Sequence, residues 1–138
     1  MVSIIMGIYN CSSTLVEALD SIIGQTYTNW ELIMCDDGSA DDTYMIAQKY
    51  IEEHSEYKIK LLKHNKNQGL NQTLNDCLQE ATGNYIARMD ADDISLPTRL
   101  EKEIAEFGKD PCLSIVSCSM VHFDENGEWG KNISSNEY

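Results

Sequence analysis

Positive charge is scarce in this chain of 138 residues. Ten lysines and arginines stand against 23 aspartates and glutamates, which gives a net charge of −13 at pH 7. Proteins that bind nucleic acid do so largely by neutralising phosphates with basic side chains, so we expect no nucleic-acid partner. An acidic protein can still bind a phosphate-bearing ligand when a divalent cation lies between the two.

The sequence also lacks a long hydrophobic run. No apolar stretch approaches the roughly 20 residues of a membrane-spanning helix. Residues 3–9 are apolar, but no basic segment precedes them and no small-residue cleavage site follows, so they do not resemble a signal peptide. We expect a cytoplasmic protein, and peripheral attachment of a longer parent protein at the inner face of the membrane stays open.

The cysteines are odd in number, and no two of them form a Cys-x-x-Cys pair. They lie at Cys11, Cys35, Cys77, Cys112 and Cys118. A zinc knuckle or a redox motif is therefore not expected, and we interpret the cysteines as reduced thiols, mostly in the core. The length suits one compact domain with a hydrophobic core of its own.

Apolar runs alternate with amphipathic segments along the chain. Strands are predicted at residues 2–9, 30–35, 59–62, 85–89 and 113–121. Helices are predicted between them, with a capping box at Thr14 and Glu17, and Pro97 in the first turn of the last helix. The third helix is expected to bury four apolar side chains: Leu70, Leu74, Leu78 and Ala81. This alternation predicts an α/β fold with a mostly parallel sheet flanked by helices.

Polar residues follow three of the predicted strands at their carboxyl ends, where open parallel sheets bind ligands. They are Tyr9 and Asn10, then Asp36 and Asp37, then Asp90, Asp92 and Asp93. Up to five carboxylates would thus face one crevice, and such clustering is costly unless a cation compensates it. Carboxylate oxygens suit Mg²⁺ or Mn²⁺, and phosphate oxygens of a ligand would complete the coordination.

These acidic residues also allow other interpretations. Residues 36–39, Asp-Asp-Gly-Ser, are by themselves more typical of a turn followed by a helix cap. A calcium loop fits the acidic positions Asp90, Asp92 and Glu101. It fails at Ile94 and Ser95, which stand where a ligand and a glycine are needed. A receiver domain would require paired acids after the first strand and a lysine after the last, and the sequence has neither.

Several segments in register resemble family 2 glycosyltransferases of the GT-A fold, above all the bacterial enzymes that build capsule and lipopolysaccharide sugars. The segments are residues 2–10, 25–33, 36–39, 83–93 and 96–100. Each is weak alone, but their order and spacing match over nearly the whole chain. Gly7 departs from the pattern, because a proline is common at this position.

The resemblance implies a role for each matching residue. Tyr9 would line or stack on the nucleotide base, usually uracil, and Asp37 would accept a hydrogen bond from the base edge. Gly69 would let the backbone approach the nucleotide. Asp90 would contact the ribose or the donor sugar. Asp92, the last acid of the Asp-x-Asp motif, would ligate the Mn²⁺ or Mg²⁺ that bridges the diphosphate.

The reaction implied is the inverting, metal-dependent transfer of a sugar from a nucleotide-diphosphate sugar, most often a UDP-sugar. The acceptor would be a saccharide or another hydroxyl compound in cell-surface polysaccharide synthesis. Inversion needs a general base. In the family it follows the Asp-x-Asp half, so the catalytic residue is unassigned, and Glu125, Glu128 and Glu137 are candidates only by default. We expect residues 1–121 to form the nucleotide-sugar-binding domain, truncated before the acceptor-binding part, and residues 122–138 to begin the acceptor region or form a loosely packed tail.

Two other functions stay open at this point. A sugar nucleotidyltransferase normally begins with a phosphate loop rich in glycine and arginine, which residues 7–10 lack. A nucleotide- or metal-binding module without catalysis would fit a chain that has no assigned base. Self-association as a homo-oligomer, through apolar surface that such a domain exposes, is also left open.

Overall fold

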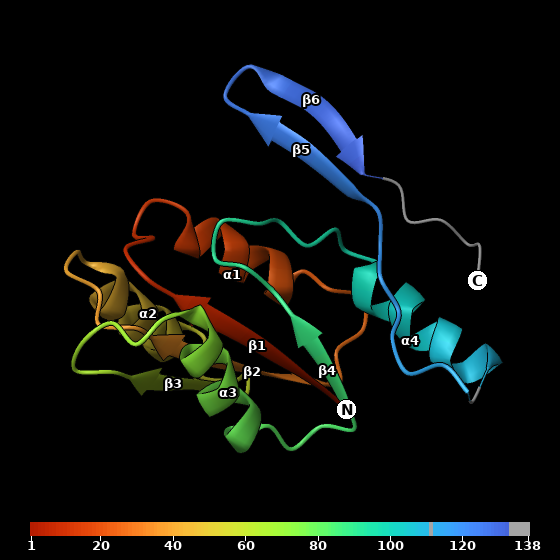
Figure 1. Cartoon of the computed structure of the whole chain (residues 1–138), viewed down its shortest axis with the longest axis horizontal. Helices are drawn as coiled ribbons and strands as arrows, with labels where there is room; N and C mark the ends of the chain where they lie inside the picture. Colours follow the sequence, from red (N-terminus) through yellow and green to blue (C-terminus); the bar gives the residue numbers. More distant parts are fainter. Residues whose placement is uncertain (111, 133–138) are drawn as a thin grey trace. The chain divides into compact units, whose positions relative to one another are not determined.

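The computed structural model of the chain describes residues 1–110 and 112–132. It contains two compact units, Met1–Pro97 and Thr98–Tyr138. The first unit carries the parallel sheet, and the second carries a helix and a hairpin (Figure 1). Within the described part of the chain, no helix is both long and apolar enough to cross a membrane.

The first unit is built on a four-stranded sheet with the strand order β3-β2-β1-β4, in which every neighbouring pair is parallel. The strands are β1 (Val2–Ile8), β2 (Trp30–Asp36), β3 (Ile59–Lys63) and β4 (Tyr85–Arg88). The central strands β1 and β2 are buried along almost their whole length, as expected of apolar strands covered on both faces. The predicted mostly parallel α/β sheet is confirmed.

The helices α1 (Leu15–Ile23), α2 (Thr43–Glu53) and α3 (Leu70–Glu80) connect the strands (Figure 1). The chain moves outward from β1 to β3 and then crosses back to place β4 on the other side of β1. Because parallel crossovers are right-handed, this reversal puts α3 on the face opposite α1 and α2. It also creates a switch point between β1 and β4, where open α/β sheets bind their ligands.

The side chains predicted to be buried on helix α3 are buried only in part, because Leu74 and Ala81 pack partly buried against the core while the other two do not. Leu70 and Leu78 are 48% and 42% exposed, whereas Thr73 and Cys77 are buried. A Cβ on Gly7 of β1 would lie 2.9 Å from the Leu70 Cδ1 and 3.2 Å from the Thr73 Cγ2, so the glycine lets the start of the helix approach the sheet closely. Thr73 and Cys77 take the most buried positions, whereas Leu70 lies beside Gly7 at the edge of this contact and stays about half-exposed.

The helix starts also differ in detail from the prediction. The Thr14 hydroxyl lies 3.4 Å from the carbonyl oxygen of Cys11 and makes no capping bond to α1, so the expected capping box with Glu17 is not formed. Helix α4 (Arg99–Lys109) has Thr98 as its N-cap, so Pro97 precedes the helix instead of lying in its first turn. Local signals placed both helix starts to within two residues, and Thr14 is the N-cap of α1, but neither N-cap side chain makes a capping hydrogen bond.

The second unit holds α4 and an antiparallel hairpin of β5 (Met120–Asp124) and β6 (Gly127–Asn132). The predicted strand at residues 113–121 is wrong, because residues 113–119 are not in a strand and are exposed over most of their length. An apolar run forms a strand only where a partner strand is available to pair with it. A turn at residues 124–127 joins the two strands, with Gly127 at φ 112°.

Candidate functional site

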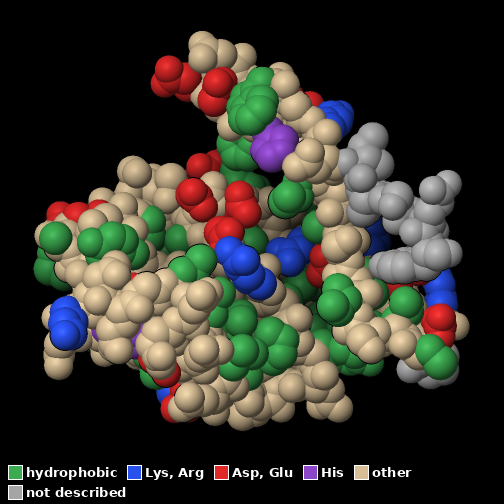
Figure 2. All heavy atoms as spheres, viewed as in Figure 1, with side chains coloured by type: hydrophobic (Ala, Val, Ile, Leu, Met, Phe, Trp, Pro, Cys, Tyr) green, Lys and Arg blue, Asp and Glu red, His purple; other side chains and the backbone are tan. Residues whose placement is uncertain are grey.

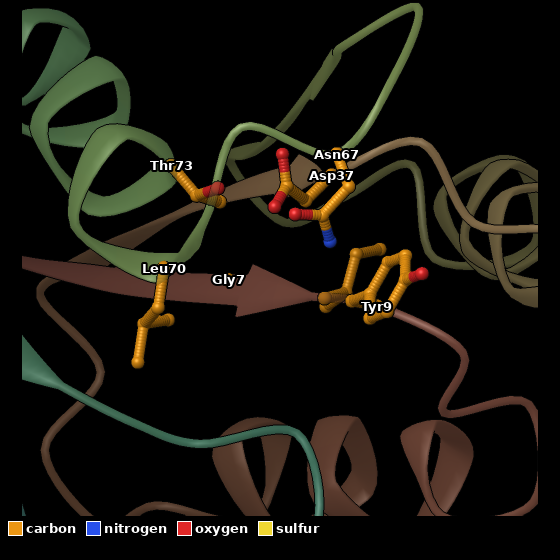
Figure 3. Close-up of a pocket in the computed structure, with 7 residues that line it drawn as sticks. Gly7, Tyr9, Asp37, Asn67, Leu70 and Thr73 are labelled. Atoms are coloured by element: carbon orange, nitrogen blue, oxygen red, sulfur yellow. The ribbon is translucent and has the colours of Figure 1, made fainter.

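A pocket of about 140 Å³ lies at the carboxyl end of β1, beside the N-terminus of α3 (Figure 3). Its lining comes from the end of β1, from the residue that follows β2, from the β3–α3 loop and from α3. The residues are Gly7, Ile8, Tyr9, Asp37, Asn67, Leu70 and Thr73. The structure thus brings together Tyr9 and Asp37, two of the predicted site residues. Asn67, Leu70 and Thr73 were missed, because no motif distinguishes them in the sequence.

Tyr9 is presented to the pocket by a loop that side chains of the next strand–helix connection hold in place. Three successive amides after Tyr9 donate hydrogen bonds to that connection: Asn10 N to Ser39 Oγ (3.0 Å), Cys11 N to Thr43 Oγ1 (2.8 Å) and Ser12 N to Asp41 Oδ2 (3.2 Å). The Tyr9 side chain itself is 49% exposed. A half-exposed ring on a fixed backbone is preorganised for stacking against a flat ligand.

Asp37 is a buried carboxylate that holds the β3–α3 loop. Its Oδ1 accepts hydrogen bonds from the Gln68 amide (2.8 Å) and from His64 Nδ1 (2.7 Å), and its Oδ2 accepts one from the Gly69 amide (2.8 Å). Burial alone would raise the pKa of Asp37, but the hydrogen bonds from His64, Gln68 and Gly69 outweigh it and lower that pKa. An ionised carboxylate with one lone pair left on Oδ2 therefore faces the pocket.

Two glycines shape the backbone around Asp37. Gly69 has φ 90°, and a Cβ there would meet nothing within 4 Å, so the position needs glycine for its conformation and not for space. Gly38 has φ 72°, and a Cβ there would lie 2.7 Å from the carbonyl carbon of Lys66. The glycine of the Asp-Asp-Gly-Ser segment therefore lets the β3–α3 loop lie against β2.

Asp36, one of the five carboxylates expected in the crevice, is fully buried at the end of β2. Its Oδ1 lies 3.4 Å from the Ser39 amide, in the manner of a turn. Its Oδ2 has no hydrogen-bond partner among residues 1–110 and 112–132. The two acids of this segment thus differ: Asp36 supports the turn, and Asp37 faces the pocket.

Asp90 and Asp92 lie in the loop after β4, at the same end of the sheet as Tyr9. Strand β4 runs parallel to β1 with Arg88 opposite Ile5. Figure 2 shows acidic side chains gathered over this loop beside basic ones. Arg88 donates to both oxygens of Asp90, with Nη2 at 2.9 Å from Oδ1 and 3.1 Å from Oδ2. Arg88 and Asp90 therefore form an ion pair at the start of this loop. Within the described part of the chain, neither acid lines the pocket.

The residues fit a divalent cation that takes only part of its coordination from protein. Asp92 is exposed and its carboxylate is at the surface. Among residues 1–110 and 112–132, no group of three or more His, Cys, Asp or Glu side chains is arranged to hold a metal ion. Mg²⁺-like ions are commonly bound through one or two carboxylates together with substrate phosphates, and this pattern matches what Asp92 offers.

His64 is the polar residue of this region that the sequence did not reveal. It follows β3, it is buried, and its ring lies between the carboxylates of Asp37 and Asp76. A lone histidine in a polar loop carries no motif. Its contacts depend on the tertiary structure, because the crossover through α3 places Asp76 beside the His64 ring.

Known proteins resemble this chain in sequence and in fold. The family model for glycosyl transferase family 2 matches residues 3–138. EpsE of Bacillus subtilis is 50% identical over 132 residues, which cover 96% of this chain and 47% of that protein. The chain therefore spans less than half the length of this relative.

Solved structures agree with the sequence match. The mannosyltransferase PcManGT from Pyrobaculum calidifontis, in complex with GDP-Man and Mn²⁺, superposes with a TM-score of 0.79 at 30% identity, covering 85% of this chain and 34% of that chain. S. aureus TarS in complex with UDP superposes with a TM-score of 0.71 at 27% identity, covering 78% of this chain and 32% of that chain. The parallel sheet, its strand reversal and the family match agree, and the chain belongs to glycosyl transferase family 2, with a GT-A fold.

Proposed function

We propose that this chain is the donor-binding part of an inverting, metal-dependent glycosyltransferase that uses a UDP-sugar. The observation that carries the proposal is the pocket in which Tyr9 and Asp37 meet, at the same end of the parallel sheet as the loop of Asp90 and Asp92. The complexes of TarS with UDP and of PcManGT with GDP-Man and Mn²⁺ support it, since both structures resemble this chain.

The base would lie between Tyr9 and Asp37. The Tyr9 ring offers a stacking face, and the Asp37 carboxylate can only accept hydrogen bonds. Uracil presents an N–H on the edge that would meet Asp37 Oδ2, whereas cytosine presents an acceptor at the same place. The chemistry of Asp37 thus favours a uridine nucleotide over a cytidine nucleotide. Gly69 would bring the backbone of the β3–α3 loop close to the nucleotide.

The diphosphate would lie toward the loop after β4. Asp92 would ligate Mn²⁺ or Mg²⁺, and Asp90 would contact the ribose or the donor sugar. A bound cation of this kind supplies Lewis-acid stabilisation of the charge that develops on the departing nucleoside diphosphate. Arg88 neutralises Asp90 and reduces the repulsion between the two carboxylates, which lie two residues apart.

The acceptor-binding region and the general base belong to the proposal for the whole protein. We place the donor domain within residues 1–121 and the start of the acceptor region, or a loosely packed tail, at residues 122–138. Glu125 and Glu128 lie exposed on the hairpin, and Glu137 lies outside the described residues, so the general base is unassigned. The parent protein would act in the cytoplasm, at the inner face of the membrane, on a saccharide acceptor of a cell-surface polysaccharide.

Thermal unfolding with and without UDP and Mn²⁺ tests the donor site. A ligand at a concentration 100-fold above its Kd stabilises the folded state by about 2.7 kcal/mol, a rise in Tm on the order of 10 °C for a domain of this size. Asp92→Asn is expected to abolish the part of the shift that requires Mn²⁺. Asp42→Asn, an exposed acid at the start of α2, is the matched control and should keep the full shift.

An unchanged melting curve of the unmodified chain in millimolar UDP and Mn²⁺ would overturn the donor-site assignment. Hydrolysis of the sugar nucleotide is the separate test of catalysis. Because no base is assigned within the chain, we expect binding without appreciable turnover. Rapid hydrolysis would show that a base is already present among these residues.

A further inference from the structure

A buried histidine bridges two carboxylates behind the proposed base site. His64 Nδ1 lies 2.7 Å from Asp37 Oδ1, and His64 Nε2 lies 2.7 Å from Asp76 Oδ2. Asp37 follows β2, His64 follows β3 and Asp76 belongs to α3, so the ring joins three parts of the fold. The donor site proposed above uses Asp37 but assigns nothing to His64.

The groups that face the ring come from two elements. From β2 and its end come Asp37 and the Cys35 thiol, whose Sγ lies 3.5 Å from Nε2. From α3 comes Asp76, whose other oxygen accepts a hydrogen bond from Gln72 Nε2 (2.9 Å). Cys77 of α3 lies beyond Cys35 and interacts with its thiol.

These surroundings favour the charged form of the ring. The hydrogen bond to Asp37 raises the pKa of His64 most, burial opposes it, and the hydrogen bond to Asp76 raises that pKa further. An imidazolium donates from both nitrogens, whereas a neutral imidazole donates from only one. Between two ionised carboxylates, both short contacts can be hydrogen bonds only while the ring is protonated.

We propose that His64, as an imidazolium, is a positioning residue for the nucleotide pocket, and that affinity for the nucleoside diphosphate falls when His64 loses its proton. This inference rests on the proposed function, because it concerns the same pocket. It assigns His64 no contact with the ligand. The histidine acts through Asp37 and through α3.

Loss of the proton weakens the pocket whichever nitrogen gives it up. If Nδ1 loses the proton, its lone pair faces the Asp37 carboxylate. The Asp37 side chain is only 5% exposed, so little water can replace the lost N–H donor. If Nε2 loses it, Asp76 loses its tie to the β3–α3 loop. Its side chain is 28% exposed and can turn to solvent. Helix α3 also carries Leu70 and Thr73, so its release moves a wall of the pocket.

The direction of the pH dependence follows from the raised pKa. The protonated arrangement is complete below the ordinary histidine pKa and is lost as the pH rises through the higher pKa of His64 in the folded protein. Affinity for UDP is therefore expected to be highest at mildly acidic pH. It should decline on the order of tenfold at alkaline pH, through loss of one charge-assisted hydrogen bond.

Titration of the 138-residue chain with UDP and Mg²⁺ between pH 6.0 and 8.5 measures this profile. His64→Asn keeps one amide donor for Asp37 but does not titrate, so its profile should be flat relative to that of the unmodified chain. His64→Leu keeps no donor and should bind weakly at every pH. His54→Asn is the matched control, because that ring stacks on Tyr50 at the end of α2 and does not line the pocket. It should keep the unmodified profile.

Asp76→Asn gives a second test that leaves the contact to Asp37 in place. The amide oxygen still accepts from Nε2, but its negative charge is gone, so the midpoint of the profile should move to lower pH. Affinity at pH 6.0 should change little. The imidazole carbon resonances of His64, assigned with the His64→Asn variant, should titrate at the same midpoint as the UDP affinity.

The outcomes separate the two proposals. If UDP binds but the unmodified chain and His64→Asn share one pH profile, the role of His64 is wrong and the donor site stands. If His64→Asn does not fold, an unshifted midpoint in Asp76→Asn overturns the role of His64 equally. If UDP fails to bind the unmodified chain at any pH, the proposed function falls and takes this inference with it.

Discussion

Glu31→Gln is expected to destabilise the protein strongly and in a way that depends on pH. Glu31 is a buried acid of β2. Its Oε1 accepts hydrogen bonds from Ser3 Oγ (2.7 Å), from the Thr82 amide (2.7 Å) and from the Thr82 hydroxyl (2.8 Å), and Lys58 pairs with its other oxygen. The carboxylate thus ties β1 and β2 to the segment that leads into β4.

The lowered pKa of Glu31 gives the size of the expected destabilisation. Burial would raise the pKa of Glu31, but the hydrogen bonds from Lys58, Ser3 and Thr82 outweigh it and lower that pKa from 4.5 to about 2. Such a shift corresponds to about 3 kcal/mol of stability at pH 7. Because the folded pKa is depressed, this contribution is complete above pH 4.5. It decreases as the pH falls toward 2, and more than half of it is gone by about pH 3.

Urea unfolding at pH 7, 5 and 3 measures the difference between the unmodified chain and Glu31→Gln. The difference should be about 3 kcal/mol at pH 7 and should shrink as the pH falls. The control is Glu53→Gln, which removes an exposed ion pair with Lys49 at 3.6 Å and should cost no more than about 0.5 kcal/mol at any pH. A difference for Glu31→Gln that stays constant from pH 7 to 3 would refute the argument from the ionised network.

Two further substitutions test the pocket and the sheet. Tyr9→Ala should weaken UDP binding on the order of tenfold or more, whereas Tyr9→Phe should retain most of it because stacking uses the ring; equal losses in a calorimetric titration would contradict stacking. Gly83→Ala should cost about 1–3 kcal/mol in urea unfolding, because its Cβ would lie 2.7 Å from the Ser3 amide nitrogen. The matched control Gly108→Ala, in helix α4 with nothing within 4 Å of the Cβ, should instead stabilise by up to about 1 kcal/mol.

The parallel sheet could be predicted from the sequence because its causes are local. Residues 2–8 and 30–36 are nearly unbroken apolar runs, and a strand buried on both faces needs little else to be identified. The order of strands and helices then limits the topology to a few right-handed arrangements. Tyr9, Asp37 and Asp90 follow β1, β2 and β4. They were predicted to lie at one edge of the sheet, and the parallel pairing of these strands places all three at that edge.

Hydrophobic periodicity gave wrong predictions where burial or strand formation depends on a neighbouring element of the fold. It indicated that Leu70 and Leu78 are buried, but Thr73 and Cys77 take the most buried positions where α3 packs on β1. It also indicated a strand at residues 113–121, where no partner strand pairs with residues 113–119 in the described part of the chain. Both errors arise because a sequence window contains no information on the neighbouring element.

The sequence by itself determined the fold class, the family resemblance and the acidic character of the site, because these depend on residue types and their spacing along the chain. Only the tertiary structure decided the separate roles of Asp36 and Asp37 and the place of His64. The contact of His64 with Asp37 joins residues 27 positions apart, and the contact with Asp76 exists only because α3 crosses back over the sheet. Hydrogen bonds act over about 3 Å, so long-range partners of this kind become visible only after the chain has folded.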